Sequence, residues 1–408
     1  MSEELPLHAP TAQKPVTKET TVSASTDSLA KDPNIVVKAP RPRWMLHIQA
    51  LFWRFLMGIG MFLHKFAFPR PMSPKFKRMI PTTVSPMPGQ IALHFYVPKD
   101  YKERKATGEN LYPVVINFHG GGFTLGKATD DARWCTTVVE DVDAVVVSVD
   151  YRLAPEHPFP TAVEDGVDAI LYLVQNFRDL HIDKEKIALS GFSSGANMCF
   201  TVPLRLLKEL DMEAAKHEER HMSVIEGTRP ALQKAVSDGR VLTKGRAGIS
   251  IKAICTWYPP TDYTHTREQR KATCARLDQQ LPAVFTDLFD ESYLQPPTMD
   301  MSDPYLSPGC APDHMLAGLP EETIMFTCEW DMLLKEGEDF RDRLRTLGKT
   351  VHYQMVPEAP HGWDKAPNPL KRTPGVQEHY LNACKDLKRL LKVAPDAATM
   401  EEAIPSED

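Results

Sequence analysis

Short apolar runs alternate with helix-like segments along most of the chain after residue 110. The apolar runs cover residues 114–118, 144–149, 187–190, 251–257, 323–327 and 351–356. Helix candidates between them include 163–177 and 335–347. Alternation of buried strands with crossover helices is typical of βαβ units, which build a parallel sheet. The pattern therefore predicts an α/β domain with a mostly parallel central sheet and helices on both faces.

Two glycine-rich motifs follow two of these apolar runs. An H-G-G-G run occupies residues 119–122, and a G-x-S-x-G motif occupies residues 191–195 with Ser193 at its centre. A strand that ends in a glycine-flanked turn and continues into a helix can hold one hydroxyl in the open above the sheet. The second motif thus predicts Ser193 as a nucleophile for acyl transfer. The glycine run predicts a loop that stabilises an anion.

A base and an acid for this nucleophile are sought downstream, because hydrolases of this type order them nucleophile, acid, base. Asp331 follows the run at 323–327, and His361 follows the run at 351–356. Both lie at the carboxyl end of a predicted strand, where open α/β sheets assemble their sites. Rivals lie on helix faces or inside regular elements, where a structural role is favoured; they are Glu329, Glu336, Glu338, His352 and His379.

Several separate motifs occur in one order between about residue 110 and residue 365. They are H-G-G-G at 119–122, D-Y-R-L-A-P-E at 150–156, the Ser193 motif, S-D-P-Y-L-S-P at 302–308, E-W-D at 329–331 and H-G at 361–362. Together they resemble the hormone-sensitive-lipase branch of α/β-hydrolase esterases. The resemblance implies an α/β-hydrolase fold with a cap from the N-terminal region. It also implies the catalytic triad Ser193, Asp331 and His361.

The same resemblance implies an oxyanion hole made by the backbone N–H groups of Gly121, Gly122 and Ser194. The chain departs from the family at two positions. Phe192 stands where a small or acidic residue is frequent, and Ala196 stands where a second glycine is frequent. The backbone mechanism does not need those side chains, so we expect activity to survive. Substrate analogy is weakened, because Phe192 adjoins the nucleophile.

These features predict a serine hydrolase that acts through an acyl-enzyme on Ser193. Together with the basic, aromatic-rich segment at 44–78, they predict that it cleaves a carboxylic ester of a hydrophobic alcohol, lipid-like or sterol-like. No metal or organic cofactor is expected. At family level, the chain resembles membrane-bound steryl acetyl hydrolases in this expected function. One alternative is an amide or formamide hydrolase on the same triad, since N-formylkynurenine formamidases have a similar loop and triad. Another is a ligand-binding receptor, like the gibberellin receptors, although these lack the histidine that His361 supplies here.

The amino-terminal hundred residues change character twice. Residues 1–40 are rich in Ser, Thr, Pro and charge, which predicts disorder and no conventional secretory signal. Residues 41–100 form a basic, apolar segment, and the chain has no Asp or Glu between Pro33 and Lys99. Arg54 interrupts the apolar stretch, so three alternatives stay open: an in-plane membrane anchor, a spanning helix, or a lid over the site. Residues 41–78 are predicted to contact a membrane surface or bilayer.

The remaining organisation follows from length and charge. The chain has 408 residues and a net charge of −6, which allows one large core and predicts no nucleic-acid partner. The catalytic domain is expected at 101–393 with a charged insertion at 208–246, followed by an acidic tail at 394–408. Residues 262–300 are expected to form cap structure.

Seven scattered cysteines favour a reducing compartment. We therefore expect an intracellular membrane-associated protein that acts on a small hydrophobic ester, with the endoplasmic reticulum or lipid droplets as candidate sites.

Overall fold

The structure is a computed structural model that describes residues 41–108, 110–222, 249–365 and 373–391. The described residues belong to one compact unit that begins at Arg41. Some predictions fall on residues outside this set, namely those for residues 1–40, for the part of the insertion after residue 222 and for the tail at 394–408.

Eight strands form one sheet in the order β1-β2-β4-β3-β5-β6-β7-β8. Strands β3 to β8 run parallel, whereas β2 pairs antiparallel with both β1 and β4. Each predicted apolar run corresponds to one strand between β3 and β8, so the mostly parallel sheet is confirmed. The bounds are β1 Phe76–Pro81, β2 Gln90–Tyr96, β3 Tyr112–Phe118, β4 Val145–Asp150, β5 Ile182–Phe192, β6 Ile251–Trp257, β7 Glu322–Cys328 and β8 Thr350–Val356.

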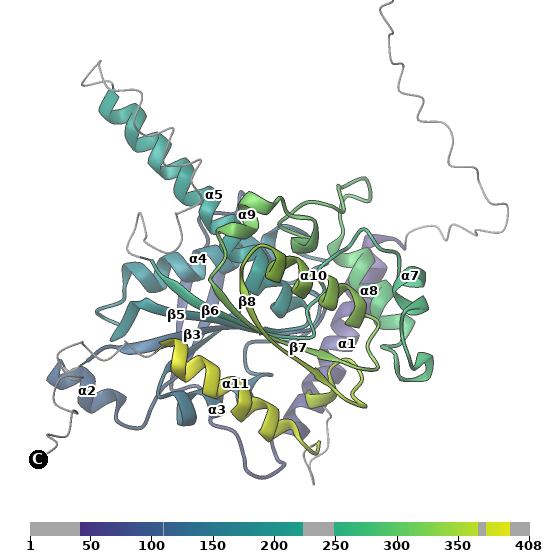
Figure 1. Ribbon diagram of the computed structural model, residues 1–408, viewed down its shortest axis with the longest axis horizontal. Coiled ribbons are helices and arrows are strands. Elements are labelled where there is room, and N and C mark those ends of the chain that lie inside the picture. Colours follow the sequence, from purple (N-terminus) through teal and green to yellow (C-terminus); the bar gives the residue numbers. More distant parts are fainter. Residues whose placement is uncertain (1–40, 109, 223–248, 366–372, 392–408) are drawn as a thin grey trace, which may run out of the picture. The chain divides into compact units, whose positions relative to one another are not determined.

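Helices cover both faces of the sheet, with α3 and α11 on one face and α4, α5 and α10 on the other (Figure 1). The bounds are α1 Arg43–His64, α2 Tyr101–Thr107, α3 Ala132–Val142, α4 Thr161–Gln175, α5 Ser194–Met222, α7 Arg267–Ala272, α8 Ala283–Tyr293, α9 Asp313–Ala317, α10 Leu334–Thr346 and α11 Val376–Leu391. The predicted helices at 163–177 and 335–347 correspond to α4 and α10. Helix α5 continues into the predicted insertion and ends at Met222.

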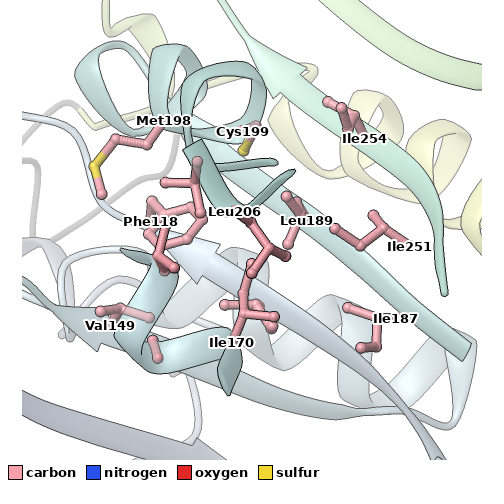
Figure 2. Close-up of a cluster of buried hydrophobic side chains, with 14 of the residues drawn as sticks. Phe118, Val149, Ile170, Ile187, Leu189, Met198, Cys199, Leu206, Ile251 and Ile254 are labelled. Carbon is pink, nitrogen blue, oxygen red and sulfur yellow. The ribbon is translucent and has the colours of Figure 1, made fainter. Parts of the chain in front are cut away.

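Burial on both faces explains why the strands read as continuous apolar runs. In β3, Val114 and Ile116 pack in the core cluster under α4 and α5, while Val115 packs in the cluster under α3 and α11. Figure 2 shows part of the first cluster, where Phe118 and Leu189 of the sheet lie near helix side chains. Such two-sided burial is a property of parallel sheets covered by helices.

The segment 41–100, predicted as one anchor or cap region, divides into two parts in the structure. Its first part is α1. Its second part, residues 76–96, forms the β1–β2 hairpin and extends the catalytic sheet at β4. Ile91, Leu93 and Phe95 are buried in the core. Their period-two spacing is the pattern of a sheet strand, because alternate side chains of a strand point to the same face. The catalytic fold therefore begins before residue 101.

The cap consists of α1 together with the segment around α7 and α8. Trp53 of α1 packs against Phe285 of α8 with their ring centroids 4.6 Å apart. Arg41 Nε donates to Glu291 Oε2 at 2.9 Å, which ties the start of α1 to α8. The predicted cap from the N-terminal region is thus confirmed, and residues from 262–300 contribute to it.

Candidate active site

The turn between β5 and α5 places Ser193 in a strained backbone conformation. Its φ is 52°, in the left-handed region that non-glycine residues rarely adopt. The two flanking glycines are required by close backbone approach. A Cβ at Gly191 would lie 2.3 Å from the carbonyl oxygen of Gly195, and a Cβ at Gly195 would lie 2.0 Å from that of Phe118. The Ser193 N–H donates to the carbonyl of Trp257 at 2.9 Å, which fixes the turn against β6.

The three predicted triad side chains meet above the carboxyl ends of β5, β7 and β8. Ser193 Oγ lies 2.8 Å from His361 Nε2. His361 Nδ1 lies 2.6 Å from Asp331 Oδ2. The other carboxylate oxygen of Asp331 accepts from the Leu333 N–H at 3.0 Å, so the acid is held at both oxygens. The structure therefore brings together residues that are 30 and 168 positions apart in the chain.

The rival acids and imidazoles are engaged elsewhere. Glu336 forms a buried ion pair with Arg270 at 2.7 Å. Glu329 accepts from the backbone N–H of Glu358 at 2.7 Å. The remaining rivals also have other neighbours: Glu338 accepts from Tyr353, His352 lies against Glu322, and His379 lies against Trp363. These contacts favour Asp331 over the glutamates as the partner of His361.

The glycine loop is held in place through its carbonyl oxygens. His119 Nδ1 donates to the Gly120 carbonyl, the N–H groups of Thr124 and Leu125 donate to that of Gly121, and Thr124 Oγ1 donates to that of Gly122. Gly121 and Gly122 have positive φ values of 123° and 60°. A Cβ at Gly122 would lie 2.2 Å from the Phe289 ring. With the carbonyls engaged, the N–H groups are the polar atoms that this loop can offer a substrate.

The D-Y-R-L-A-P-E motif supports this loop and has no direct part in the site. The Tyr151 ring stacks on the His119 ring at 4.2 Å, and its hydroxyl donates to the His119 carbonyl at 2.8 Å. Arg152 forms an ion pair with buried Asp165 at 2.7 Å. These supporting roles could not be predicted from the motif alone, because each depends on a partner from another element.

A buried ion cluster beneath the site was not predicted from the sequence. Lys365 Nζ lies 2.8 Å from Asp131 and 3.0 Å from Asp364, and it stands 3.6 Å from the centroid of the Phe192 ring. Burial disfavours the charged ammonium, but the two carboxylates outweigh it and hold the pKa of Lys365 above its usual value. Phe192 is itself buried and stacks on Trp257. The departure from the family at Phe192 thus fills the core beside the nucleophile.

Two cavities of different size meet at the triad. Both are lined by Ser193, His361, Gly122 and Phe289. The small chamber, of about 40 Å³, extends towards α7 and α8 and includes Tyr293 in its wall. The large chamber, of about 550 Å³, extends beneath α1. The α1 residues that form part of its wall are Trp53, Leu56, Met57, Gly60 and Met61. Two groups that diverge from a carbonyl carbon at Ser193 would therefore meet very different amounts of space.

Comparisons with known proteins agree with this fold. A protein-family model described as alpha/beta hydrolase fold matches residues 115–365. "Arylacetamide deacetylase-like 2" of Homo sapiens is 28% identical over 331 residues, which are 72% of this chain and 75% of that protein. "Carboxylic ester hydrolase LipN" of Mycobacterium tuberculosis is 29% identical over 260 residues, 64% of this chain but only 59% of LipN. The crystal structure of EstE1, a thermophilic carboxylesterase from a metagenomic library, shares the fold with a TM-score of 0.63 and 24% identity, covering 84% of this chain and 98% of EstE1.

Proposed function

The chain belongs to the α/β-hydrolase fold family and is a carboxylic ester hydrolase, and from this premise we propose that it cleaves esters of short acids and bulky hydrophobic alcohols. The reaction passes through an acyl-enzyme on Ser193. The observation that carries the proposal is the continuous contact from Ser193 through His361 to Asp331, beside the glycine loop.

In the first half of the reaction, Ser193 Oγ attacks the ester carbonyl while its proton passes to His361 Nε2. Asp331 accepts from the His361 Nδ1–H, which keeps Nε2 free to take that proton and stabilises the imidazolium that forms. Negative charge grows on the carbonyl oxygen. The N–H groups of Gly121, Gly122 and Ser194 donate to it, and one such donor is worth about 3 kcal/mol in the transition state.

In the second half, the imidazolium returns the proton to the departing alcohol oxygen, and the acyl group stays on Ser193. Water then enters, gives a proton to His361 Nε2 and attacks the acyl carbonyl. The same N–H groups stabilise the second oxyanion. Collapse of this intermediate releases the acid and returns the proton to Ser193 Oγ.

The unequal chambers support a short acyl group and a large alcohol. A space of about 40 Å³ for water-sized groups accommodates a methyl or ethyl substituent rather than a fatty chain. The large chamber, about 550 Å³, lies within the range of cavities that enclose drug-sized ligands. Its α1 wall is apolar, which suits a lipid-like or sterol-like alcohol. We assign the acyl group to the small chamber.

This assignment is tested with acetate, butyrate and octanoate esters of one alcohol. The wild-type kcat/KM should fall at least about tenfold from acetate to octanoate, because the longer chain overfills the small chamber. Met332→Ala enlarges that chamber and should narrow the difference. Met57→Ala is the matched control in the large chamber and should leave acyl preference unchanged. If only Met57→Ala alters acyl preference, the acyl group lies beneath α1 and the assignment is wrong.

A second candidate function is hydrolysis of aryl acetamides on the same triad. The name of the human relative, arylacetamide deacetylase-like 2, favours it, and an acetyl group fits the small chamber. The comparison of phenyl acetate with acetanilide decides between the two. A higher kcat/KM for the anilide than for the ester would make the amide the preferred substrate class.

We also propose that the protein attaches to an intracellular membrane through α1, which lies in the membrane plane. By length and composition this helix could cross a bilayer. However, Arg54 Nε donates to the Thr124 carbonyl at 2.8 Å, and the guanidinium forms an ion pair with Glu156 at 2.8 Å. A spanning helix would have to break these contacts and carry the charge into hydrocarbon, which costs about 2.5–3.5 kcal/mol for the arginine alone. The contacts therefore support the in-plane alternative.

The outer face of α1 supplies apolar surface for this attachment. The exposed large side chains of α1 are Trp44, Ile48, Leu51, Phe52, Phe55, Leu56, Ile59, Phe62 and Leu63, of which Leu56 also lines the large chamber. Just beyond the helix, Arg70 lies over the rings of Phe66 and Phe68 at 5.4 and 5.0 Å. Aromatic side chains beside a cation suit the boundary between headgroups and acyl chains. Because the inner face of α1 lines the large chamber, an apolar ester could pass from the bilayer to Ser193 beside this helix.

Flotation with phosphatidylcholine vesicles, with and without phosphatidylserine, tests the attachment. The triple variant Phe52→Ser, Phe55→Ser, Phe62→Ser should lose most of its vesicle binding and keep turnover of a water-soluble acetate. The matched control Leu277→Ser, Met355→Ser, Leu381→Ser removes exposed apolar side chains elsewhere and should still float. Equal flotation of both triple variants would exclude α1 as the attachment site. Deletion of the whole segment up to about residue 80 would remove β1 from the sheet together with α1, so point substitutions on α1 are used.

A further inference from the structure

The large chamber contains a polar side chain that the hydrolytic reaction does not use. Two neighbouring carboxylates, Asp130 and Asp131, form part of its wall. Asp131 is fully engaged, because it accepts from Asn117 Nδ2 at 2.8 Å and forms the ion pair with Lys365 at 2.8 Å. Asp131 therefore holds Asn117 and Lys365 beneath the site. Asp130 differs from it.

Asp130 is only 6% exposed, and one of its carboxylate oxygens lacks a partner. Oδ2 accepts from the Lys127 N–H at 3.1 Å. Oδ1 is buried and accepts no hydrogen bond from any of the residues that the structure describes. Leaving a buried acceptor unsatisfied is unfavourable, so Oδ1 calls for a donor from outside the described protein, and the side chain that carries it lines the large chamber.

The charge state of Asp130 agrees with a role as an acceptor. Burial raises its pKa to about 6, with the neighbouring His119 opposing the shift and Asp131 adding to it. At neutral pH the group is therefore mainly a carboxylate, and it presents a strong acceptor to the chamber. Lys127 and Lys65 also act on Asp130 electrostatically. With these cations and Lys365 already present, a neutral donor fits better than a further ammonium group.

We propose that Asp130 Oδ1 accepts a hydrogen bond from a hydroxyl on the alcohol part of the substrate, remote from the ester. This rests on the proposed function, in which that alcohol occupies the large chamber. The substrate class is thereby narrowed to esters of bulky hydrophobic alcohols that carry a second, free hydroxyl. Leu125, Met57 and Met61 surround the remainder of the molecule with apolar contacts.

Two structural roles for Asp130 compete with this proposal. The carboxylate could serve only to hold the turn at Lys127, with Oδ1 hydrated. Alternatively, the Lys65 ammonium could turn towards Asp130 and pair with it; burial lowers the pKa of Lys65, and Asp130 opposes that shift. The first role predicts no effect of Asp130 on the choice between substrates. The second predicts that removal of Lys65 changes that choice as strongly as removal of Asp130, so selectivity measured on both variants separates the two roles from the proposal.

The experiment uses the full chain and a set of acetate esters of one rigid polycyclic alcohol. The set contains the deoxy ester and isomers that each carry one additional hydroxyl remote from the ester. The wild type should prefer one isomer over the deoxy ester in kcat/KM. Asp130→Ala should lower that preference about 10- to 100-fold, mainly through KM, and Asp130→Asn, which keeps an acceptor oxygen, should retain part of it. Lys65→Met is the control and should leave the preference intact.

The outcomes separate this inference from the function on which it rests. If the wild type hydrolyses the deoxy ester but prefers no isomer, the hydroxyl contact is wrong and the hydrolytic function stands. The same conclusion follows if the preference persists in Asp130→Ala. If Lys65→Met abolishes the preference as strongly as Asp130→Ala, the pair with Lys65 is the correct reading. If no ester in the set is hydrolysed, the proposed function itself fails.

Discussion

Gly122→Ala tests the oxyanion loop at a position where an added side chain would overlap the Phe289 ring. The added Cβ would lie 2.2 Å from the Phe289 ring, which forms part of the wall of both chambers. The φ of Gly122 is 60°, so alanine also brings left-handed strain of about 1–2 kcal/mol. To relieve the overlap, either the Phe289 side chain or the loop must shift. A shift of the loop moves the Gly122 N–H away from the developing oxyanion.

The expected loss follows from these two effects. Complete loss of one oxyanion donor costs about 3 kcal/mol, which is a factor of about 10² in kcat. Movement of Phe289 can absorb part of the overlap, so we expect Gly122→Ala to lower kcat by about 10- to 100-fold. The free energy of unfolding should fall by about 1–2 kcal/mol through the backbone strain. A change of this size leaves most of the protein folded.

The assay combines steady-state kinetics on a soluble acetate with urea unfolding. Phe289→Ala in the Gly122→Ala background removes the overlapping ring and should restore part of kcat without restoring the stability lost to strain. That combination distinguishes loop displacement from unfolding. A Gly122→Ala variant whose kcat stays within about threefold of the wild type would refute the place of Gly122 in the oxyanion hole.

Three further predictions use single substitutions. Asp331→Asn should lower kcat by about 10⁴-fold, because the amide favours the wrong tautomer of the imidazole, whereas Glu329→Gln should remain near wild type; the reverse order in steady-state rates would reassign the acid. Burial raises the pKa of Asp130 from 3.8 to about 6, so the folded state keeps a proton that the unfolded state loses, and the free energy of unfolding should decrease as pH rises from about 4 to 6. Asp130→Asn should lack this decrease in urea titrations at the two pH values, and an unchanged slope would show that Asp130 is not its source. Lys365→Met leaves buried carboxylates without a cation and should destabilise the fold by about 3–5 kcal/mol; a loss in thermal unfolding equivalent to less than about 1 kcal/mol would contradict the buried pair.

The sequence predicts the parts of this molecule that depend on local pattern. The strands at 114–118 and 351–356 are visible as apolar runs, and the Ser193 turn is visible because its glycines are required by close backbone contacts. The order of nucleophile, acid and base along the chain directs attention to Asp331 and His361, which the structure brings together with Ser193.

Features that depend on partners distant in the chain could not be predicted. Arg54 looks like an interruption of an apolar helix until its bond to Glu156, 102 positions away, is known. The lack of acidic residues at 76–96 suggests continuity with the anchor or cap region, although the period-two pattern of a strand is present in β2. The ion cluster of Lys365 and the two unequal chambers arise from packing between elements, for which no local pattern exists.

The most direct test of the account is covalent labelling of the folded full-length protein with a fluorophosphonate, read by intact mass and peptide mapping. The account predicts a single adduct on Ser193, none on Ser193→Ala, and much slower labelling of His361→Ala, since His361 Nε2 takes the Ser193 proton. A folded wild-type protein that forms no adduct, or forms it at another residue, would contradict the claim that Ser193 is the activated nucleophile.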